Sequence, residues 1–195
     1  MAAQEIRAGA DGVPRCWWCG DDPLYTSYHD DEWGRPIHDE ERFFGLLLLE
    51  TFQAGLSWIT ILRKRETFRA AFADFDAEKI AAFDDDDRTR LMGDAGIIRN
   101  RQKIDAAIKN AAATLRLRDE ADGLAALCWS YAPGPRTRRL RGDVDEIPAF
   151  TDEAMALSKD LKKRGFSFVG PTVIYAHMQS AGLVDDHIEG CHVEV

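Results

Sequence analysis

The sequence contains no run of apolar residues that approaches the length of a membrane span. A helix that crosses a bilayer needs about 20 consecutive, mostly apolar residues, and every apolar stretch of this chain is far shorter. The N-terminus also lacks the charged start, apolar stretch and small-residue cleavage site of a secretory signal peptide. We therefore expect a soluble, cytoplasmic protein with no membrane partner.

Alternating polar and apolar stretches, which are typical of half-buried strands, are also scarce. Apolar residues instead recur at helical spacing almost throughout, which predicts an all-α fold. The length of 195 residues suits one domain, which we place at 15–195 and expect to have two helical lobes. Residues 1–14 are rich in alanine and glycine and lack periodic apolar positions, so we expect a flexible lead-in there.

Basic residues are outnumbered by acidic ones. The formal net charge of -9 argues against a nucleic-acid partner, because phosphate binding depends on lysine and arginine. However, acidic residues concentrate at positions such as 84–87, while basic residues cluster at 63–65, 99–103, 136–141 and 162–164. These clusters either form a local basic face or are ordinary solvated helix ends and loops, and the sequence leaves both interpretations open.

Capping residues mark the first long helices. Asp39 suits the N-cap of a helix over 39–54, which ends at Gly55. Ser57 suits the N-cap of the next helix, whose apolar positions extend to Phe68. We therefore expect two helices joined by a tight turn.

The middle of the chain predicts two further helices and a loop. A short helix over 76–83 is followed by a long one over 98–118, with Lys103 among its polar positions. Residues 133–148 hold three prolines and four arginines, which is typical of an exposed loop.

Near the C-terminus, two helices flank a short hairpin between glycines. The first is predicted over 151–164 with Thr151 as N-cap, and the second begins at Pro171, a favoured first helical residue. Gly165 and Gly170 let the backbone turn sharply, and the free amides of the second helix suit phosphate binding. The alternative is an ordinary helical hairpin in a bundle.

Glu50 is a carboxylate on an apolar helix face. At helical spacing it shares that face with Phe43, Leu46, Leu47 and Ala54. A buried carboxylate needs a basic partner, several hydrogen bonds or a ligand that supplies donors. The alternative is a helix buried all round, with Glu50 reaching solvent near its end.

Aromatic residues are dense in the N-terminal third, at Trp17, Trp18, Tyr25, Tyr28, Trp33 and Trp58. Such rings can stack on a base that is flipped out of a duplex, and they attract a cationic base most strongly. The alternative is that they fill the core.

Candidate metal ligands lie at both ends of the chain: Cys16, Cys19, His29, His187, Cys191 and His192. The four cysteines of a cytoplasmic protein are not expected to form disulfides. Two thiolates and two imidazoles suit tetrahedral zinc, which here would join the two termini. The alternative is plain burial, and the pattern leaves the choice of ligands open.

Between Arg15 and Cys191 these features resemble the 3-methyladenine DNA glycosylase I family of the helix-hairpin-helix glycosylases. The strongest stretches are DPLY at 22–25, YHD at 28–30, EWG at 32–34, QAGLSWIT at 53–60, DAGIIR at 94–99, LSK at 157–159, KKRGF at 162–166 and VG at 169–170. The resemblance implies the fold of that superfamily, with the helix-hairpin-helix at about 151–182.

The resemblance also implies roles for individual residues. One structural Zn²⁺ per chain would join the terminal segments through Cys16, His29, His187 and Cys191. The residues implied to be catalytic in the base pocket are Glu50, Tyr28 and Trp58, with Trp18 as a stacking ring and with Tyr25 and Trp33 close by. The implied DNA contacts are Gln53, Gly55, Leu56, Lys163, Arg164, Gly165 and Gly170.

The implied activity is hydrolysis of the N-glycosidic bond of 3-methyladenine flipped out of double-stranded alkylated DNA, the first step of base excision repair. The products would be free 3-methyladenine and an abasic site. We expect a monomeric, monofunctional enzyme without lyase activity, and we assign neither Asp185 nor Asp186 as the group that activates water.

Two hypotheses from other classes compete with this one. A zinc module that binds damaged DNA without cutting it would share the metal and the hairpin, but it would not need Glu50 on an apolar face beside aromatic rings. A catalytic zinc hydrolase would need an open metal position, which four protein ligands would close.

Overall fold

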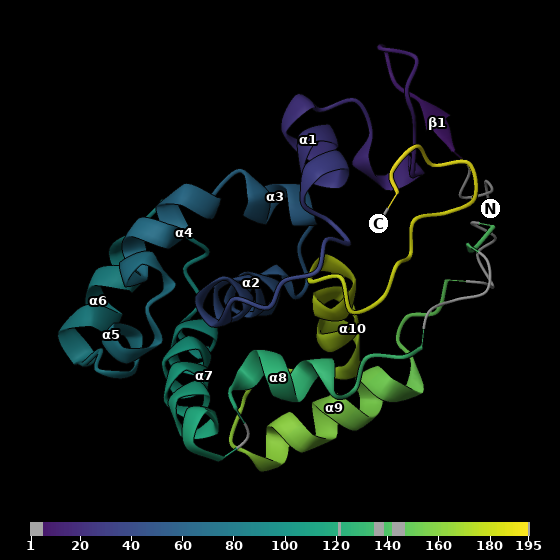
Figure 1. Cartoon of the computed structure of the whole chain (residues 1–195). Coiled ribbons are helices and arrows are strands. Elements are labelled where there is room, and N and C mark those ends of the chain that lie inside the picture. The colour runs from purple at the N-terminus through teal and green to yellow at the C-terminus, as the bar shows by residue number, and fades with distance from the viewer. Residues whose placement is uncertain (1–5, 121, 135–138, 142–146, 195) are drawn as a thin grey trace.

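In the computed structural model the chain is mostly helical, as predicted, and the residues it describes are 6–120, 122–134, 139–141 and 147–194 (Figure 1). The helices are α1 (Pro23–Asp31), α2 (Glu40–Gln53), α3 (Trp58–Leu62), α4 (Arg65–Ala71), α5 (Ala77–Ala81), α6 (Asp85–Gly93), α7 (Arg101–Glu120), α8 (Leu124–Trp129), α9 (Asp152–Lys163) and α10 (Pro171–Ser180). Single-turn 3-10 helices occur at η1 (Trp17–Cys19) and η2 (Ala73–Phe75). Among the described helices, none is long and apolar enough to cross a bilayer.

Helix α2 lies at the centre of the molecule, with α7 and α10 packed beside it (Figure 1). Its buried apolar residues include Phe43, Phe44, Leu47, Leu48 and Phe52. The Asp39 carboxylate accepts a hydrogen bond from the Arg42 amide at 2.9 Å, which confirms the predicted N-cap. After α2 the chain turns at Gly55, whose φ of 81° is readily adopted only by glycine.

The helix that was expected to begin at Ser57 and to carry apolar positions as far as Phe68 is in fact two helices, α3 and α4, with a break at 63–64. Ser57 occupies the N-cap position, but its hydroxyl lies 2.8 Å from the Thr60 hydroxyl and caps no amide. The prediction of one helix is wrong because apolar residues on both sides of the break face the same core. The helical period therefore continues across the break.

Helix α6 is not predicted by the sequence, although its first turn is the acidic run noted above. The Asp84 carboxylate accepts hydrogen bonds from the amides of Asp86 and Asp87 at 2.9 and 3.1 Å, and Asp87 accepts one from the Asp84 amide in return. Carboxylates are favoured at a helix N-terminus because the first amides there have no helical partners. The acidic run therefore begins a helix.

Helices α5 and α7 correspond to the predicted pair with shifted ends. α5 follows Asp76 and ends at Ala81, and α7 begins at residue 101 because the Asn100 side chain accepts a hydrogen bond from the Lys103 amide (3.2 Å). Lys103 was expected at a polar position of this helix. The structure corrects this, because Lys103 is only 6% exposed.

The predicted exposed loop at 133–148 lies partly outside the described residues. Within the described part, Leu140 is buried and forms a parallel bridge with Ile188. Its carbonyl accepts a hydrogen bond from the Glu189 amide at 2.7 Å. The prediction of exposure is therefore wrong at Leu140, which pairs with the C-terminal segment.

The two terminal segments lie side by side (Figure 1). Strands β1 (Arg7–Ala8) and β2 (Pro14–Arg15) form an antiparallel pair within and beside the expected lead-in. The Pro14 carbonyl accepts a hydrogen bond from the His192 amide at 3.0 Å, which joins the start of the chain to its end. The single domain at 15–195 with two lobes stays a prediction.

Helices α9 and α10 flank the predicted hairpin. Thr151 caps α9 through a hydrogen bond from the Ala154 amide (3.2 Å), and Pro171 is the first residue of α10, both as predicted. Within the hairpin, Phe166 and Val169 are buried, whereas Phe168 is exposed and has a φ of 56°. A positive φ is unusual for a bulky residue, so the surrounding contacts must hold it there.

Candidate active site and metal centre

Glu50 lies in the last turn of α2 and is 2% exposed, so it points inward as its helical position predicts. The Ser180 hydroxyl at the end of α10 donates a hydrogen bond to Glu50 Oε1 at 2.7 Å. Among the described residues, Oε2 has no hydrogen-bond partner. The alternative in which Glu50 reaches solvent is therefore wrong, and one carboxylate oxygen remains available to a ligand.

Burial also changes the protonation of Glu50. It raises the pKa of this carboxyl group to about 8, against which the hydrogen bond from Ser180 acts only partly. Glu50 is consequently protonated for the most part at neutral pH. A cationic ligand in contact with it would favour the ionised form.

A cavity of about 240 Å³ lies next to Glu50. Its lining residues are Trp17, Trp18, Tyr25, Tyr28, Trp33, Glu50, Gln53, Trp58, Ile147, Ala176, Gln179, Ser180 and Asp186. All the residues that the sequence assigned to the base pocket therefore surround one cavity. The aromatic cluster leaves an open, mostly apolar space beside a carboxylate, so it does more than fill the core.

The rings contact one another at steep angles around this cavity. The ring centroid of Trp18 lies 4.9 Å from that of Trp33 and 5.1 Å from that of Tyr25, and the Tyr28 and Trp58 centroids are 5.4 Å apart. Burial, followed by the charge of Glu50, raises the pKa of Tyr28, which keeps its hydroxyl protonated. Within the described part of the chain, the buried N–H of Trp58 has no partner.

Three polar residues in the cavity wall were not found from the sequence: Ser180, Gln179 and Asp186. One carboxylate oxygen of Asp186, Oδ2, accepts two hydrogen bonds. The Tyr175 hydroxyl donates one at 2.5 Å and the side-chain amide of Gln179 donates the other at 2.7 Å. Ser180 contacts Glu50 across 130 residues of sequence. No local pattern marks these residues as part of one wall, because the packing of α10 against α2 brings Gln179 and Ser180 to the cavity and the segment after α10 folds back to place Asp186 beside them.

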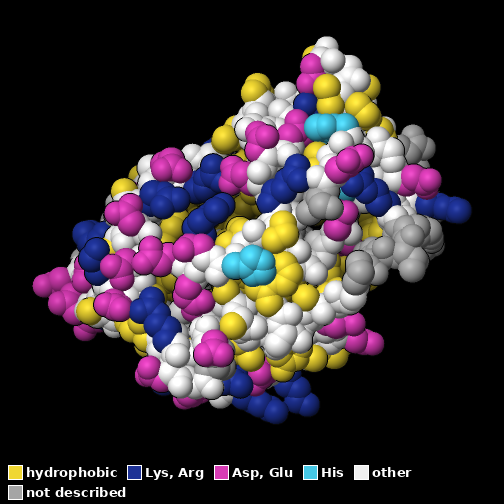
Figure 2. Space-filling model, viewed as in Figure 1, with side chains coloured by type: hydrophobic (Ala, Val, Ile, Leu, Met, Phe, Trp, Pro, Cys, Tyr) yellow, Lys and Arg dark blue, Asp and Glu magenta, His cyan; other side chains and the backbone are white. Residues whose placement is uncertain are grey.

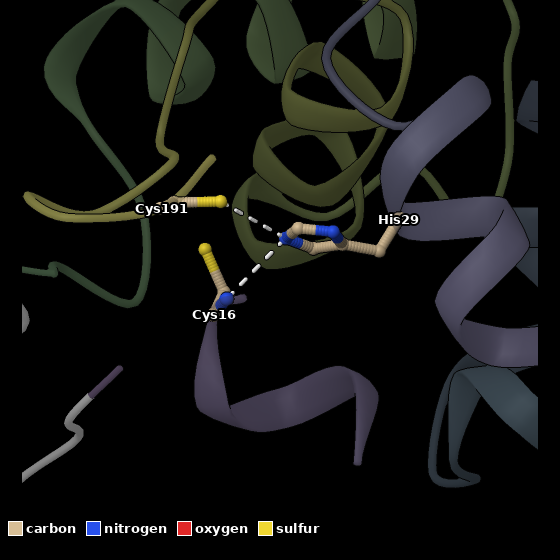
Figure 3. A group of neighbouring side chains, drawn as sticks. All are labelled: Cys16, His29 and Cys191. Carbon is tan, nitrogen blue, oxygen red and sulfur yellow. Dashed lines mark hydrogen bonds between the residues drawn. The ribbon is translucent and has the colours of Figure 1, made fainter. Parts of the chain in front are cut away.

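Three of the predicted metal ligands form a buried group. One ligand atom each of Cys16, His29 and Cys191 lies within 4.8 Å of the others. The His29 ring points toward the space between the two cysteine side chains (Figure 3), and its Nε2 lies 3.5 Å from the Cys191 sulfur. A hydrogen bond between the two thiols lowers the pKa of Cys191, which His29 also lowers, and raises the pKa of Cys16.

His187, the fourth predicted ligand, lies beside this group, with its ring centroid 5.2 Å from that of His29. Its Nε2 is buried and has no hydrogen-bond partner in the part of the chain that the structure describes. Its Nδ1 contacts the Asp185 carboxylate at 2.7 Å, and the Nδ1 of His29 contacts Asp30 at 2.8 Å. Carboxylates orient metal-binding histidines in this way. In the described residues, however, the group of close ligand atoms that contains both cysteines includes His29 and not His187, so His187 as the fourth ligand stays a prediction.

The two spare candidate ligands have other contacts. The Cys19 thiol donates to the Cys16 carbonyl at 3.2 Å, which directs it toward the backbone. His192 Nε2 contacts the Asp30 carboxylate at 2.9 Å, so a second group that could hold a metal consists of His29, Asp30 and His192. That group is partly exposed, whereas the group with both cysteines is buried.

The residues predicted to contact DNA lie at two loops. Gln53 lines the cavity, Gly55 follows it in the turn, and the Leu56 side chain is 42% exposed. At the hairpin, Gly165 has a φ of 97° and Gly170 is the N-cap residue of α10. Of the adjacent cations, Lys163 is exposed and Arg164 contacts Asp160 at 3.2 Å.

The basic clusters do not merge into one positive surface on the face shown in Figure 2, where basic and acidic side chains are interspersed. Arg63 pairs with Asp22 at 2.6 Å and Arg65 pairs with Glu32 at 2.5 Å. Residues 136–138 of a third cluster lie outside the described residues. On this face the surface resembles solvated helix ends more than a broad phosphate-binding stripe.

Comparison with known proteins gives consistent matches over nearly the whole chain. A family model described as methyladenine glycosylase matches residues 18–194. DNA-3-methyladenine glycosylase 1 of Escherichia coli K12 is 49% identical over 179 residues, which cover 92% of this chain and 96% of that protein. DNA-3-methyladenine glycosylase of Haemophilus influenzae is 45% identical over 177 residues, 91% of this chain and 96% of its own length.

Solved structures give the same result. A crystal structure of 3-methyladenine DNA glycosylase I is 48% identical and superposes with a TM-score of 0.88, covering 93% of this chain and all of that one. A variant of 3-methyladenine DNA glycosylase I in complex with 3-methyladenine is 38% identical, with a TM-score of 0.82, covering 88% of this chain and 92% of that one.

Proposed function

Because the chain belongs to the methyladenine glycosylase family, we propose that it is a DNA-3-methyladenine glycosylase that releases 3-methyladenine from alkylated DNA and leaves an abasic site. One observation carries the proposal. A buried carboxylate with an unoccupied oxygen, Glu50 Oε2, lies beside an aromatic cavity in the described part of the chain. A base flipped out of the duplex and carrying positive charge would meet both a charge partner and stacking surfaces there.

Selection of the base follows from Glu50. Methylation at N3 places positive charge on adenine, and the exocyclic amine of that base can donate to Glu50 Oε2. Guanine carries an oxygen at the corresponding position, which the carboxylate would repel. Binding of guanine would therefore leave the buried Glu50 Oε2 without a hydrogen-bond donor. The cationic base also favours ionised Glu50 over the protonated form, which strengthens the contact.

The reaction needs little acid catalysis. Water forms a bond to the sugar carbon as the carbon–nitrogen bond to the base breaks, and the electrons of that bond neutralise the cationic ring. The base therefore leaves without taking up a proton, and the attacking water loses its proton to solvent. Tyr28, Trp58 and Glu50 bind and orient the base. Because water is the group that attacks the sugar carbon, we propose a monofunctional enzyme.

We further propose one structural zinc ion held by Cys16, His29, His187 and Cys191. Four protein ligands leave no open metal position, so the ion would supply no reaction step and would join the two termini. The paired carboxylates of Asp30 and Asp185 and the buried His187 Nε2 support this proposal. The cytoplasmic location stays a prediction. The monomeric state stays a prediction.

A duplex treated with a methylating agent tests the function, because it contains both 3-methyladenine and 7-methylguanine. We expect the protein to release 3-methyladenine at least about a hundredfold faster than 7-methylguanine, since at position 6 the first base carries an amine that can donate to Glu50 and the second carries an oxygen. Chromatography of the released bases measures both rates. Binding of the duplex without release of either base would instead support the zinc module that binds DNA without cutting it.

A further inference from the structure

Helix α7 carries polar side chains on a face that the fold buries. Lys103 and Asn110 are both almost inaccessible to solvent, and they lie seven residues apart, close to two helical turns. They therefore project from the same side of the helix. Buried ammonium and amide groups are unfavourable unless they are paired. Here both are paired with backbone groups, Lys103 at the end of α2 and Asn110 in the hairpin before α10.

Lys103 holds the end of α2. Its ammonium donates to the carbonyls of Phe52 and Ala54 at 2.8 and 2.6 Å. The last carbonyls of a helix lack helical partners and carry partial negative charge, so a cation is favourable there. The turn at Gly55 and the exposed Leu56 follow directly, so Lys103 fixes the base of the loop that carries these two predicted DNA contacts.

Asn110 holds the hairpin between α9 and α10. Its amide donates to the Ser167 carbonyl at 3.0 Å, and its oxygen accepts from the Ser167 amide at 2.7 Å. On the other side, the Ser158 hydroxyl donates to the Val169 carbonyl at 2.6 Å. Phe168, with its positive φ, lies between these two fixed points. The contacts thus hold the hairpin in one conformation.

We propose that Lys103 and Asn110 are positioning residues that set the spacing between the loop at 55–56 and the hairpin at 165–170, so that both meet the DNA backbone together. The inference rests on the proposed function. Neither Lys103 nor Asn110 is among the described residues that line the base cavity. Their loss should therefore weaken binding of DNA while leaving binding of the free base intact.

Lys103→Met and Asn110→Leu test this, because each preserves the size of the side chain and removes its bonds to a loop. Two dissociation constants are measured by tryptophan fluorescence. One is for a duplex with a stable abasic-site analogue and the other is for free 3-methyladenine. We expect the first to rise about tenfold or more and the second to stay within about twofold. The KM for alkylated DNA should rise with little change in kcat.

Thr114→Val is the matched control. Thr114 is buried on the same helix, but its hydroxyl donates to the Asn110 carbonyl within that helix (3.0 Å), so DNA affinity should be retained. Lys103→Arg, which keeps a cation able to reach carbonyls, should restore most of the affinity lost in Lys103→Met. If Lys103→Met does not fold, Lys103→Gln, which can still donate to one carbonyl, takes its place.

The outcomes separate the two proposals. A parent protein that releases no 3-methyladenine would reject the proposed function. An active parent whose Lys103 and Asn110 variants bind the duplex like the parent would overturn the positioning inference. Equal losses of DNA and free-base affinity, or an equal loss in Thr114→Val, would also overturn it, because the effect would then be general destabilisation.

Discussion

Above pH 8, Glu50→Gln is expected to unfold at a higher urea concentration than the parent protein, although it removes the central group of the base pocket. The ordinary pKa of a glutamate is 4.5, and burial raises the pKa of folded Glu50 to about 8. Below pH 4.5 the group is protonated in both states. Between these values the folded protein retains a proton that the unfolded chain has released, so stability falls as pH rises. Glutamine carries no such penalty.

The size of the effect follows from the two pKa values. Their difference corresponds to about 5 kcal/mol at most, which relaxation and water entry would reduce. Urea unfolding of both proteins from pH 4 to pH 9 measures it, and the two curves should converge at acid pH, where the amide oxygen can still accept from Ser180. Glu41→Gln, an exposed position on the same helix, is the control and should follow the parent. If the free energies of unfolding of the parent and of Glu50→Gln changed with pH in parallel, the raised pKa of a buried Glu50 would be contradicted.

The second large effect is expected at the metal site. His187→Ala should lower the zinc content below one ion per chain and reduce the free energy of unfolding by several kcal/mol. In small zinc-finger peptides, the free energy of binding a structural Zn²⁺ ion is roughly 10–16 kcal/mol, and it contributes to the stability of the folded state. Metal analysis and thermal unfolding with and without a chelator measure both changes.

Two milder variants test the arrangement of the metal site. Asp185→Asn leaves the ligand in place but removes the carboxylate that orients His187, so zinc affinity should fall roughly 10- to 100-fold. Cys19→Ser should keep a full complement of zinc, because that thiol is directed to a backbone carbonyl. A His187→Ala protein that still holds one tightly bound zinc per chain would show that the ligand set is wrong.

Local patterns were sufficient for the elements that depend on neighbours in sequence. The caps at Asp39 and Thr151 and the burial of Glu50 follow from helical spacing and capping chemistry, and the structure confirms them. Helix α6 was missed because a run of aspartates is an unfavourable helix interior but a favourable first turn. Lys103 was misplaced because a charged residue in a helix ordinarily faces solvent, whereas here it meets the end of another helix.

The remaining parts of the site depend on contacts between distant segments. Gln179 and Ser180 enter the cavity wall through the position of α10, and Asp186 enters it from the segment that follows this helix. Similarly, the spacing of Cys16 and Cys19 suits zinc, and no local rule chooses between them. The fold chooses, because it brings Cys16 next to His29 and Cys191.

The rate of 3-methyladenine release from methylated duplex DNA, compared between the parent and Glu50→Gln at saturating protein, tests the central claim most directly. We predict release by the parent and by Glu41→Gln, and a rate about 10- to 100-fold lower in Glu50→Gln, the equivalent of one hydrogen bond to a charged group. Release at the parent rate by a folded, zinc-loaded Glu50→Gln protein would contradict the assignment of Glu50 as the group that recognises the base.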